Sequence, residues 1–388
     1  MPLDDLFPID VGALQETCDE LDLWRDRLGS RGALSRRWAG RLRRELEAQA
    51  IGSSLAMEQI PVTIDQVRQV LAGVPPPEVD AGDVALVTGY RDAMEFVLRR
   101  ADEPVFRWSR ELITGIHDRV LAGNWGAGAG KLRDGAVYIV NSGTREVRFT
   151  PPAAADVPAL VDRACEIAEA NTWHPAITSG WIHLAIAAIH PFSDGNGRTS
   201  RVLASLAMYR GGFRLPEFTS LEEWWGRRRD DYYGAFACLG ARFDPKADVT
   251  PFVATHLRAQ VSQSAALHLK EAVERDIWGA LENIASDRHL PERITNALWD
   301  AFFLRETTSP YYREIADVSA ASARNDLAGA VSAGLLRPVG ERRFRRYLPG
   351  DDLHRAVGGE FGIATSHVLE AARDLILGEL SRRVRGDR

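Results

Sequence analysis

Residues 190–201 read His190-Pro191-Phe192-Ser193-Asp194-Gly195-Asn196-Gly197-Arg198-Thr199-Ser200-Arg201, and they lie between two helix-forming runs. The apolar run from Trp181 to Ile189 predicts a helix that ends at His190, and a second predicted helix opens at Arg198. Glycines on both sides of an asparagine let successive backbone N–H groups converge, and the positive end of the second helix adds to them. The pattern predicts a helix–loop–helix corner whose loop is an anion cradle suited to phosphates.

The polar side chains of this stretch are those that phosphate chemistry needs. Histidine exchanges a proton near neutral pH, so His190 is a candidate general base. Asp194 offers hard oxygen ligands of the kind that Mg²⁺ prefers, usually shared with phosphate oxygens. Arg198 and Arg201 are three residues apart and therefore lie on one helical face, where guanidinium groups suit forked contacts to oxyanions.

The stretch resembles the signature of the Fic family, His-Pro-Phe-x-Asp-Gly-Asn-Gly-Arg-x-x-Arg, at every defined position. A match of this length favours an enzyme over the alternative, a structural corner with a capping aspartate and two solvated arginines. The resemblance implies transfer of AMP from ATP to a Tyr, Thr or Ser hydroxyl of a target protein. It also implies a mainly α fold, in which residues 101–265 form a Fic-type helical catalytic core with a β-hairpin flap.

The same resemblance implies a role for each residue of the stretch. His190 would take the proton of the attacking hydroxyl, and Asp194 would hold Mg²⁺ across the α- and β-phosphates of ATP. Arg198 would contact the β-phosphate region and Arg201 the γ-phosphate. The phosphate chain would lie on the cradle formed by Gly195, Asn196 and Gly197.

A second segment resembles a regulatory element of the family. Many members carry an inhibitory helix of the form Ser/Thr-x-x-x-Glu-Gly/Asn, and Ser54-Leu55-Ala56-Met57-Glu58-Gln59 matches it except at Gln59. The resemblance implies that Glu58, from the segment that Ser54 opens, restrains activity by pairing with Arg201. The alternative for Glu58 is an ordinary surface carboxylate.

Residues 1–100 are predicted as an N-terminal helical region. Helical periodicity runs through residues 13–50, and Gly52-Ser53-Ser54 interrupts it, so the inhibitory segment is expected as a separate short helix over residues 53–60. Pro75-Pro76-Pro77 is expected as a stiff linker.

Two β-prone runs precede the motif. Residues 136–140 and 146–150 are rich in valine, isoleucine and aromatic residues, and Asn141-Ser142-Gly143-Thr144 separates them, which is typical of a hairpin. In the Fic family such a flap pairs with an extended target segment by strand addition. The resemblance therefore implies that a target protein docks on residues 136–150.

The chain changes character beyond residue 265. Residues 266–304 are predicted as linker helices, residues 305–350 resemble a winged helix-turn-helix module, and residues 351–388 are expected to hold a C-terminal helix. The wing is basic and would suit DNA phosphates, but the expected recognition helix, residues 319–333, has Arg324 as its one basic residue. Contact with DNA and contact with protein both stay open. The basic residues of the wing are Arg342, Arg343, Arg345 and Arg346.

Three aromatic side chains outside the motif have two interpretations each. His183 lies on the helical face of His190 but at a depth where packing is expected. Tyr232 and Tyr233 could line an adenine site, although aromatic core is the favoured interpretation.

Composition sets the class of the protein and its compartment. The chain has 388 residues, a length that suits several domains, and its formal net charge is −6. Its three cysteines are widely spaced, which suits a reducing cytoplasm. Residues 1–10 are acidic without an apolar core, so no signal peptide is expected, and no apolar run approaches the about 20 residues of a membrane span. Arginine far outnumbers lysine, which indicates genome composition, and a bacterial origin is expected. A homodimer stays open.

Three functions are compatible with these patterns. The first is protein adenylyltransferase activity restrained by Glu58. The second is removal of AMP from a modified protein, or transfer of another nucleotide or phosphate moiety, by the same site. The third is a winged-helix DNA-binding regulator, against which the intact His190 and Asp194 argue, because a pure binding protein needs neither.

Overall fold

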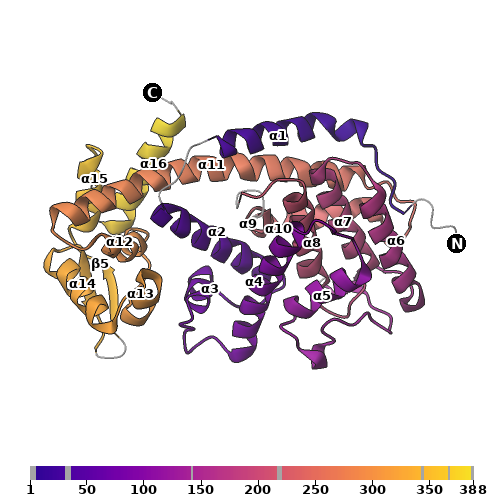
Figure 1. Cartoon of the computed structure of the whole chain (residues 1–388), viewed down its shortest axis with the longest axis horizontal. Coiled ribbons are helices and arrows are strands. Elements are labelled where there is room, and N and C mark those ends of the chain that lie inside the picture. Colours follow the sequence, from indigo (N-terminus) through magenta and orange to yellow (C-terminus); the bar gives the residue numbers. More distant parts are fainter. Residues whose placement is uncertain are drawn as a thin grey trace. The chain divides into compact units, whose positions relative to one another are not determined.

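The protein is mainly helical with two small sheets, as its sequence predicts (Figure 1). A computed structural model describes residues 6–30, 36–140, 143–215, 221–341, 345–365 and 368–385. The chain divides into two compact units. The first unit comprises Met1–Ala33, Arg43–Val67 and Pro77–Ala265, and the second comprises Leu34–Leu42, Arg68–Pro76 and Ala266–Arg388. Among the described helices, none has both the length and the apolar character that crossing a membrane requires.

Five helices build the core of the first unit around the motif. Helix α7 is mostly apolar, and every residue of its stretch from Ala176 to Ile189 except Ala187 is buried. It packs against α6 and α8, and α4 and α5 pack against α8. Pairs of apolar helices that pack in this way give a rigid base for the loop between α7 and α8. The five helices are α4 (Ala81–Ala101), α5 (Arg110–Val120), α6 (Val157–Ala170), α7 (Pro175–Ile189) and α8 (Asn196–Arg210).

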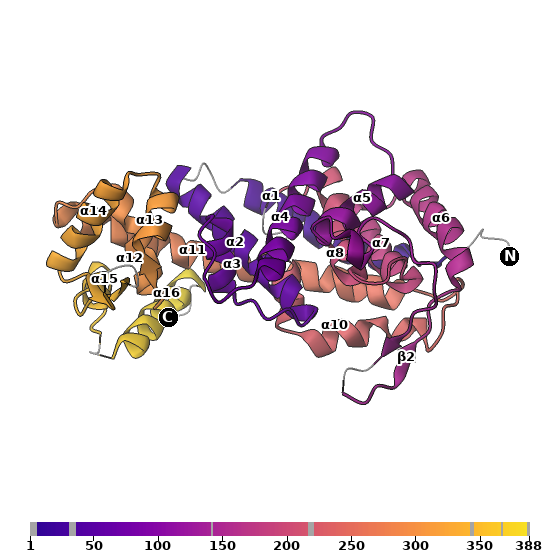
Figure 2. The ribbon, with the colours of Figure 1, turned by 90° about the horizontal axis from the view of Figure 1, so that it is seen from below.

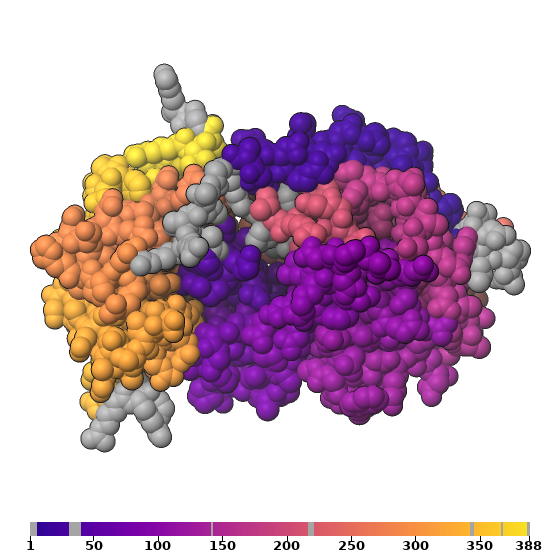
Figure 3. All heavy atoms as spheres, in the orientation of Figure 1, coloured from indigo at the N-terminus to yellow at the C-terminus, as the bar shows by residue number. Residues whose placement is uncertain are grey.

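Shorter elements surround this core. Helix α1 (Gln15–Gly29) lies on the outside of the unit, in indigo in Figure 3. It is joined to the start of α7 by a contact of 3.3 Å between Asp22 Oδ1 and His174 Nε2. Further helices that lie wholly within this unit are η1 (Gly12–Leu14), η2 (Trp125–Ala127), η3 (Ala154–Asp156), α9 (Leu221–Gly226), α10 (Arg229–Ala235) and η5 (Phe236–Leu239).

The predicted hairpin is present, but its strands are much shorter than residues 136–150 suggest. Strands β1 (Ile139–Val140) and β2 (Val147–Phe149) pair antiparallel. No third strand of the described chain extends this sheet, and a two-stranded ribbon gains little stability from its own pairing. Figure 2 shows the segment of β2 projecting away from the helices. Asn141 and Ser142 of the predicted turn lie outside the described residues.

The predicted break at Gly52-Ser53-Ser54 is wrong. Helix α2 (Arg36–Met57) continues through it, so no separate helix occupies residues 53–60. Gly52 serves close packing instead, because a Cβ at this position would lie 3.0 Å from Ile64 Cγ1 at the start of α3 (Ile64–Leu71).

The second unit contains a helix, a turn, a second helix and a two-stranded hairpin, in the order that residues 305–350 predict. Its sheet has the antiparallel strand order β3-β5-β4. Arg342 and Arg343, at the predicted wing, lie outside the described residues. The elements are η6 (Glu292–Ile294), α12 (Thr295–Phe302), β3 (Thr307–Thr308), α13 (Ser309–Ala316), α14 (Ala320–Ser332), β4 (Leu336–Val339) and β5 (Arg346–Pro349).

Two predicted segments differ from the structure at this end of the chain. Residues 266–304 hold helices, but the first of them is the end of α11 (Thr250–Asp287), which runs unbroken past the predicted boundary at residue 265 and has no proline after its first turn to stop it. Residues 351–388 hold two helices, α15 (Leu353–Glu360) and α16 (Leu369–Arg385), where one was predicted.

Candidate active site

Two positions of the motif loop adopt left-handed backbone conformations. His190 has φ of 51° and ends α7, where its N–H donates to Ile186 O at 3.0 Å. Histidine is among the side chains that tolerate this region. Gly195 has φ of +76°, and a Cβ there would lie 3.2 Å from His117 Nε2. A glycine is therefore required both by conformation and by space.

The imidazole of His190 is held in the form that a general base needs. Its Nδ1 lies 3.1 Å from Ala187 O, and because a carbonyl only accepts, Nδ1 carries the proton. Nε2 is left as the acceptor. Burial lowers the pKa of His190 below its ordinary value of 6.5, so the ring is neutral at pH 7.

Asp194 and Arg198 form an ion pair on the first turn of α8. Arg198 Nη2 donates to Oδ1 at 3.2 Å and to Oδ2 at 3.1 Å. The Arg198 side chain is 3% exposed, whereas that of Asp194 is 62% exposed. Nε and Nη1 of Arg198 are buried without a hydrogen-bond partner among the described residues. Buried donors are normally paired with an acceptor, so these two N–H groups are available to donate to a bound anion.

The side-chain amide of Asn196 is turned into the loop and away from the cradle. The side chain is 3% exposed and turns back to the loop, where Oδ1 accepts from Phe192 N at 2.9 Å and Nδ2 donates to Phe192 O at 2.8 Å. Its amide therefore braces the loop instead of facing a phosphate. The cradle consists of the backbone N–H groups that open α8, which have no partner within the helix.

Two residues outside the motif position this loop, and neither was predicted from the sequence. His117 of α5 stacks on Phe192 with ring centroids 3.6 Å apart. Its Nδ1 accepts from Gly130 N at 3.0 Å, so Nε2 carries the proton and donates to Asp194 O at 2.9 Å. Burial lowers the pKa of His117 to about 4, which keeps the ring neutral. The second residue, Arg133, donates to His190 O at 2.7 Å through Nε.

Arg201, Ser54 and Glu58 are brought together as predicted. Arg201 Nε donates to Ser54 Oγ at 2.9 Å, and Nη2 donates to Ser54 O at 3.2 Å and to Glu58 Oε1 at 2.7 Å. Arg201 and Ser54 are buried, and Glu58 lies in the turn after α2 with its side chain 26% exposed. The carboxylate also approaches the cradle, because a Cβ on Gly197 would lie 2.5 Å from Glu58 Oε1.

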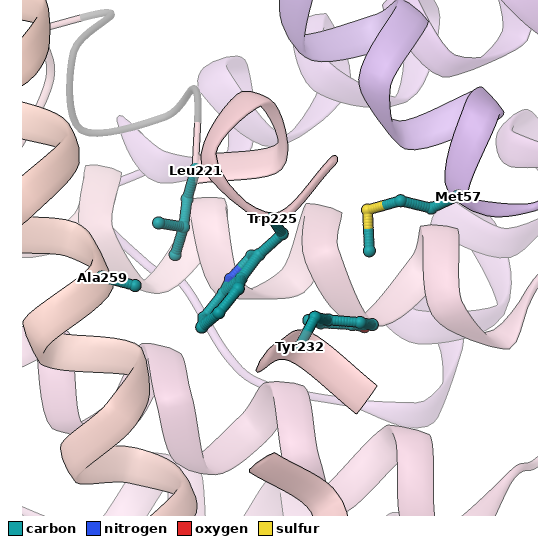
Figure 4. Close-up of a cluster of buried hydrophobic side chains, with 5 residues drawn as sticks. All are labelled: Met57, Leu221, Trp225, Tyr232 and Ala259. Carbon is teal, nitrogen blue, oxygen red and sulfur yellow. The ribbon is translucent and has the colours of Figure 1, made fainter. Parts of the chain in front are cut away.

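A buried apolar cluster fixes the end of α2 and therefore Glu58. Met57 packs with Trp225 and Tyr232, and Figure 4 shows its side chain pointing toward both rings. Tyr233 donates from its hydroxyl to Met57 O at 3.1 Å. The remaining members of the cluster are Leu221 and Ala259.

His183 and Tyr232 have the packing roles that were favoured for them. Both are buried, and His183 Nε2 lies 3.0 Å from the Tyr232 hydroxyl. Burial raises the pKa of Tyr232 to about 12 and lowers the pKa of His183 well below 6.5, so neither is charged at neutral pH. Tyr233, by contrast, is half exposed.

The donor set suits a magnesium ion only together with a nucleotide. In the described part of the chain no three His, Cys, Asp or Glu side chains gather as a metal site. Asp194 is the exposed carboxylate beside the cradle. Mg²⁺ is commonly held by one or two carboxylates plus substrate phosphates and water, so a single aspartate fits it.

Part of the chain is similar in sequence to known proteins. Residues 107–208 match the Fic/DOC family model. A relative from Culex quinquefasciatus, named protein adenylyltransferase Fic, is 30% identical over 208 residues, which cover 51% of this chain and 39% of the relative. A relative from Caenorhabditis briggsae, named protein adenylyltransferase fic-1, is 33% identical over 159 residues, which cover 39% of this chain and 27% of the relative. The chain thus spans well under half the length of these curated relatives.

A solved structure extends the likeness to nearly the whole chain at the level of fold. A crystal structure of a Fic family protein from Desulfovibrio desulfuricans G20 covers 90% of this chain and 96% of its own, with a TM-score of 0.54 and 22% sequence identity. Residues 107–208, with the helix–loop–helix corner of His190 and Arg201 inside them, therefore make up a Fic/DOC family domain.

Proposed function

We propose that this chain transfers AMP from ATP to a hydroxyl group of a target protein. One observation carries the proposal: a neutral histidine with a free Nε2 lies in the same loop as a helix N-terminus and a buried arginine with two unused donors. A base beside an anion cradle suits transfer of a phosphorus centre to a hydroxyl. The names of the relatives support the same activity.

Each residue has a defined task in the proposed reaction. His190 Nε2 accepts the proton of the target hydroxyl as its oxygen bonds to the α-phosphorus of ATP. The bond from the α-phosphorus to the bridging oxygen of the β-phosphate breaks, and pyrophosphate leaves. Nε and Nη1 of Arg198, together with the opening N–H groups of α8, stabilise the negative charge on the phosphate oxygens. Asp194 would hold Mg²⁺, which when bound neutralises charge on the leaving pyrophosphate.

We further propose that Glu58 restrains this reaction. Its carboxylate already pairs with Arg201 and lies against Gly197, so it competes with the terminal phosphate of ATP for both. A nucleotide that enters beside it is expected to bind with its α-phosphate misaligned for in-line attack.

The target would dock on the hairpin of residues 136–150. Strands β1 and β2 form a sheet to which the described chain adds no third strand, and the side chains of Tyr138, Val140 and Val147 in this segment are exposed. An extended peptide can add as a further strand to the edge of such a sheet, which brings its hydroxyl to the site by main-chain hydrogen bonds.

We infer that residues 305–350, which follow α12, form a winged helix-turn-helix module. The order α12, β3, α13, α14, β4 and β5 supports this inference. Its partner would be DNA or another protein.

Incorporation of α-labelled nucleotide tests the proposed activity. Wild type, Glu58→Gly and Glu58→Gly with His190→Ala are incubated with Mg²⁺ and each of ATP, CTP, GTP and UTP, and the mass shift of self-modified protein is measured. We expect an AMP adduct with Glu58→Gly that disappears with His190→Ala. An adduct from another nucleotide alone would favour a different donor. Release of AMP from a previously modified protein, without its incorporation, would favour the reverse activity.

A further inference from the structure

Arg133 is a buried cation that pairs with no carboxylate in the described part of the chain. It is 5% exposed, and burial lowers its pKa. Its guanidinium donates to carbonyl oxygens alone: Nε to His190 O at 2.7 Å, Nη1 to Gly135 O at 2.9 Å, and Nη2 to Pro152 O at 2.7 Å and Ile189 O at 3.5 Å.

These contacts join three segments that are far apart in sequence. Gly135 comes just before β1, and Pro152 comes just after β2, so the side chain holds both ends of the hairpin segment. His190 and Ile189 are the end of α7. The backbone of Arg133 adds a further hydrogen bond to the segment after α7, since its N–H donates to Pro191 O at 2.9 Å.

Guanidinium is suited to this task in a way that an ammonium group is not. Its five N–H donors lie in one plane and reach several acceptors in fixed directions, whereas the lysine ammonium is a compact point charge on a flexible stem. Hydrogen bonds from a charged donor are also roughly twice as strong as neutral ones. Buried carbonyls at the end of α7 would otherwise have lost their water without gaining a partner.

We propose that Arg133 is a positioning residue that couples the hairpin of residues 136–150 to the orientation of His190. The left-handed conformation of His190 aims its imidazole, and Arg133 holds the carbonyl of that same residue. Arg133 would therefore position both groups that must meet in the reaction: the hairpin that binds the target strand, and the histidine that accepts the proton of the target hydroxyl. This inference rests on the proposed transfer to a hydroxyl.

Replacing Arg133 should misalign the base without removing it. In the background of Glu58→Gly, Arg133→Lys keeps the positive charge but cannot reach the three segments together. We expect kcat for transfer to a target to fall about 10²-fold, as misplacement of a reacting group by about 1 Å does, while KM for ATP stays near its value. Arg119→Met is the matched control, because Arg119 also donates to a carbonyl, Gly115 O at 2.7 Å, but among the described residues it makes no hydrogen bond to the loop of residues 190–195.

Chemical rescue separates alignment from mere stability. Arg133→Ala leaves a space of guanidinium shape, so a few millimolar guanidinium ion, far below denaturing concentrations, should restore part of its lost kcat. The same ion should not accelerate Glu58→Gly or the Arg119→Met control. The inference would be overturned if an Arg133 variant melted at lower temperature yet transferred AMP at the parental rate. It would also be overturned if guanidinium did not restore kcat in folded Arg133→Ala while Arg133→Lys kept the parental kcat.

A readout independent of activity keeps the inference apart from the proposed function. The charged groups near the His190 ring are Arg133, Glu58 and Asp194, and the positive charge of Arg133 helps to lower its pKa. An NMR titration of the His190 ring should show a higher pKa in Arg133→Ala than in wild type and no change in Arg119→Met. An unchanged His190 titration in folded Arg133→Ala contradicts the inference. Absence of labelling in the Glu58→Gly parent contradicts the proposed function instead.

Discussion

The carboxylate of Glu58 lies where a side chain on Gly197 would have to be. A Cβ on Gly197 would be 2.5 Å from Glu58 Oε1 and 3.2 Å from Arg201 Nη1. The opening turn of α8 therefore already faces an anion, and that anion belongs to the protein. Helix N-termini favour carboxylate and phosphate for the same reason, so the two compete for one place.

Removal of this carboxylate should activate the enzyme. We expect Glu58→Gly to raise incorporation of α-labelled AMP about 10-fold or more, because ATP can then reach Arg201 and align for attack. Glu58→Asp should raise it less, since a charge remains on a shorter side chain. Combining Glu58→Gly with Arg201→Ala should abolish the gain, because the partner of the γ-phosphate is gone. Equal rates for wild type and Glu58→Gly would show that Glu58 is an ordinary surface residue.

His190 should be required for transfer but not for folding. In the Glu58→Gly background we expect His190→Ala to lower the rate by about 10²–10⁴-fold, the usual contribution of a general base. Burial lowers the pKa of His190, so the neutral base persists below pH 6.5 and the acid limb of the pH–rate profile should lie there. Rates measured from pH 5 to 8 test this. An acid limb above pH 6.5 would disagree with the assignment.

Asn196→Asp should distinguish a bracing role from a phosphate contact. A carboxylate can still accept from Phe192 N, but it can no longer donate to Phe192 O and would repel it. We expect the free energy of unfolding to fall by about 1–3 kcal/mol, which thermal melting without any nucleotide would show as a lower melting temperature. If the variant melts like wild type and only its KM for ATP rises, Asn196 contacts the nucleotide after all.

The buried His256 of α11 should make the first unit sensitive to acid. Burial lowers its pKa from 6.5 to about 4, so below pH 6.5 the unfolded chain binds a proton that the folded chain refuses. Stability is therefore lost as pH falls, by about 2 kcal/mol between pH 6.5 and 5. His256→Gln should be less stable at pH 7 but show a smaller loss on acidification. Thermal melting at both pH values measures this, and a parallel loss in both proteins would be inconsistent with a neutral His256.

The wing should determine any binding of DNA by the second unit. Arg337 and Arg345 are exposed there, while Arg346 is engaged with Glu306 at 2.7 Å. If the module binds DNA, its affinity falls steeply as the salt concentration rises. The double variant Arg337→Ala, Arg345→Ala should then have a shallower slope of log affinity against log salt concentration, by about 0.9 for each phosphate that is no longer neutralised. Fluorescence anisotropy from 50 to about 200 mM salt is the measurement, with the exposed Arg99→Ala of α4 as control. No binding at low salt would favour a protein partner.

Much of the site was predictable because the motif is contiguous. Residues of one loop and one helical turn meet by local geometry alone, which is why His190, Asp194 and Arg198 could be placed from spacing. Arg133 and His117 could not, since they reach the loop from 57 and 77 residues away in sequence and depend on packing.

Two further details also have physical causes. Gly52 has the sequence pattern of a helix breaker, but the helix accommodates it and α3 packs against its missing side chain. The family resemblance places Asn196 in the phosphate cradle, but a sequence pattern does not say which way the side-chain amide turns. At Gly52 a tertiary contact overrides a local propensity, whereas at Asn196 a local hydrogen bond within the loop fixes the side chain.

A nucleotide that approaches this protein meets two fields of opposite sign. The formal net charge of −6 repels it, but mobile ions screen charges farther apart than about 8 Å at physiological ionic strength. Arg133 brings a positive charge to the backbone of His190, and its hydrogen-bond acceptors among the described residues are carbonyl oxygens and not carboxylates. Moderate salt should therefore weaken the repulsion by the net charge more than the local attraction by the arginine. The association rate of the nucleotide is expected to rise between low and physiological ionic strength.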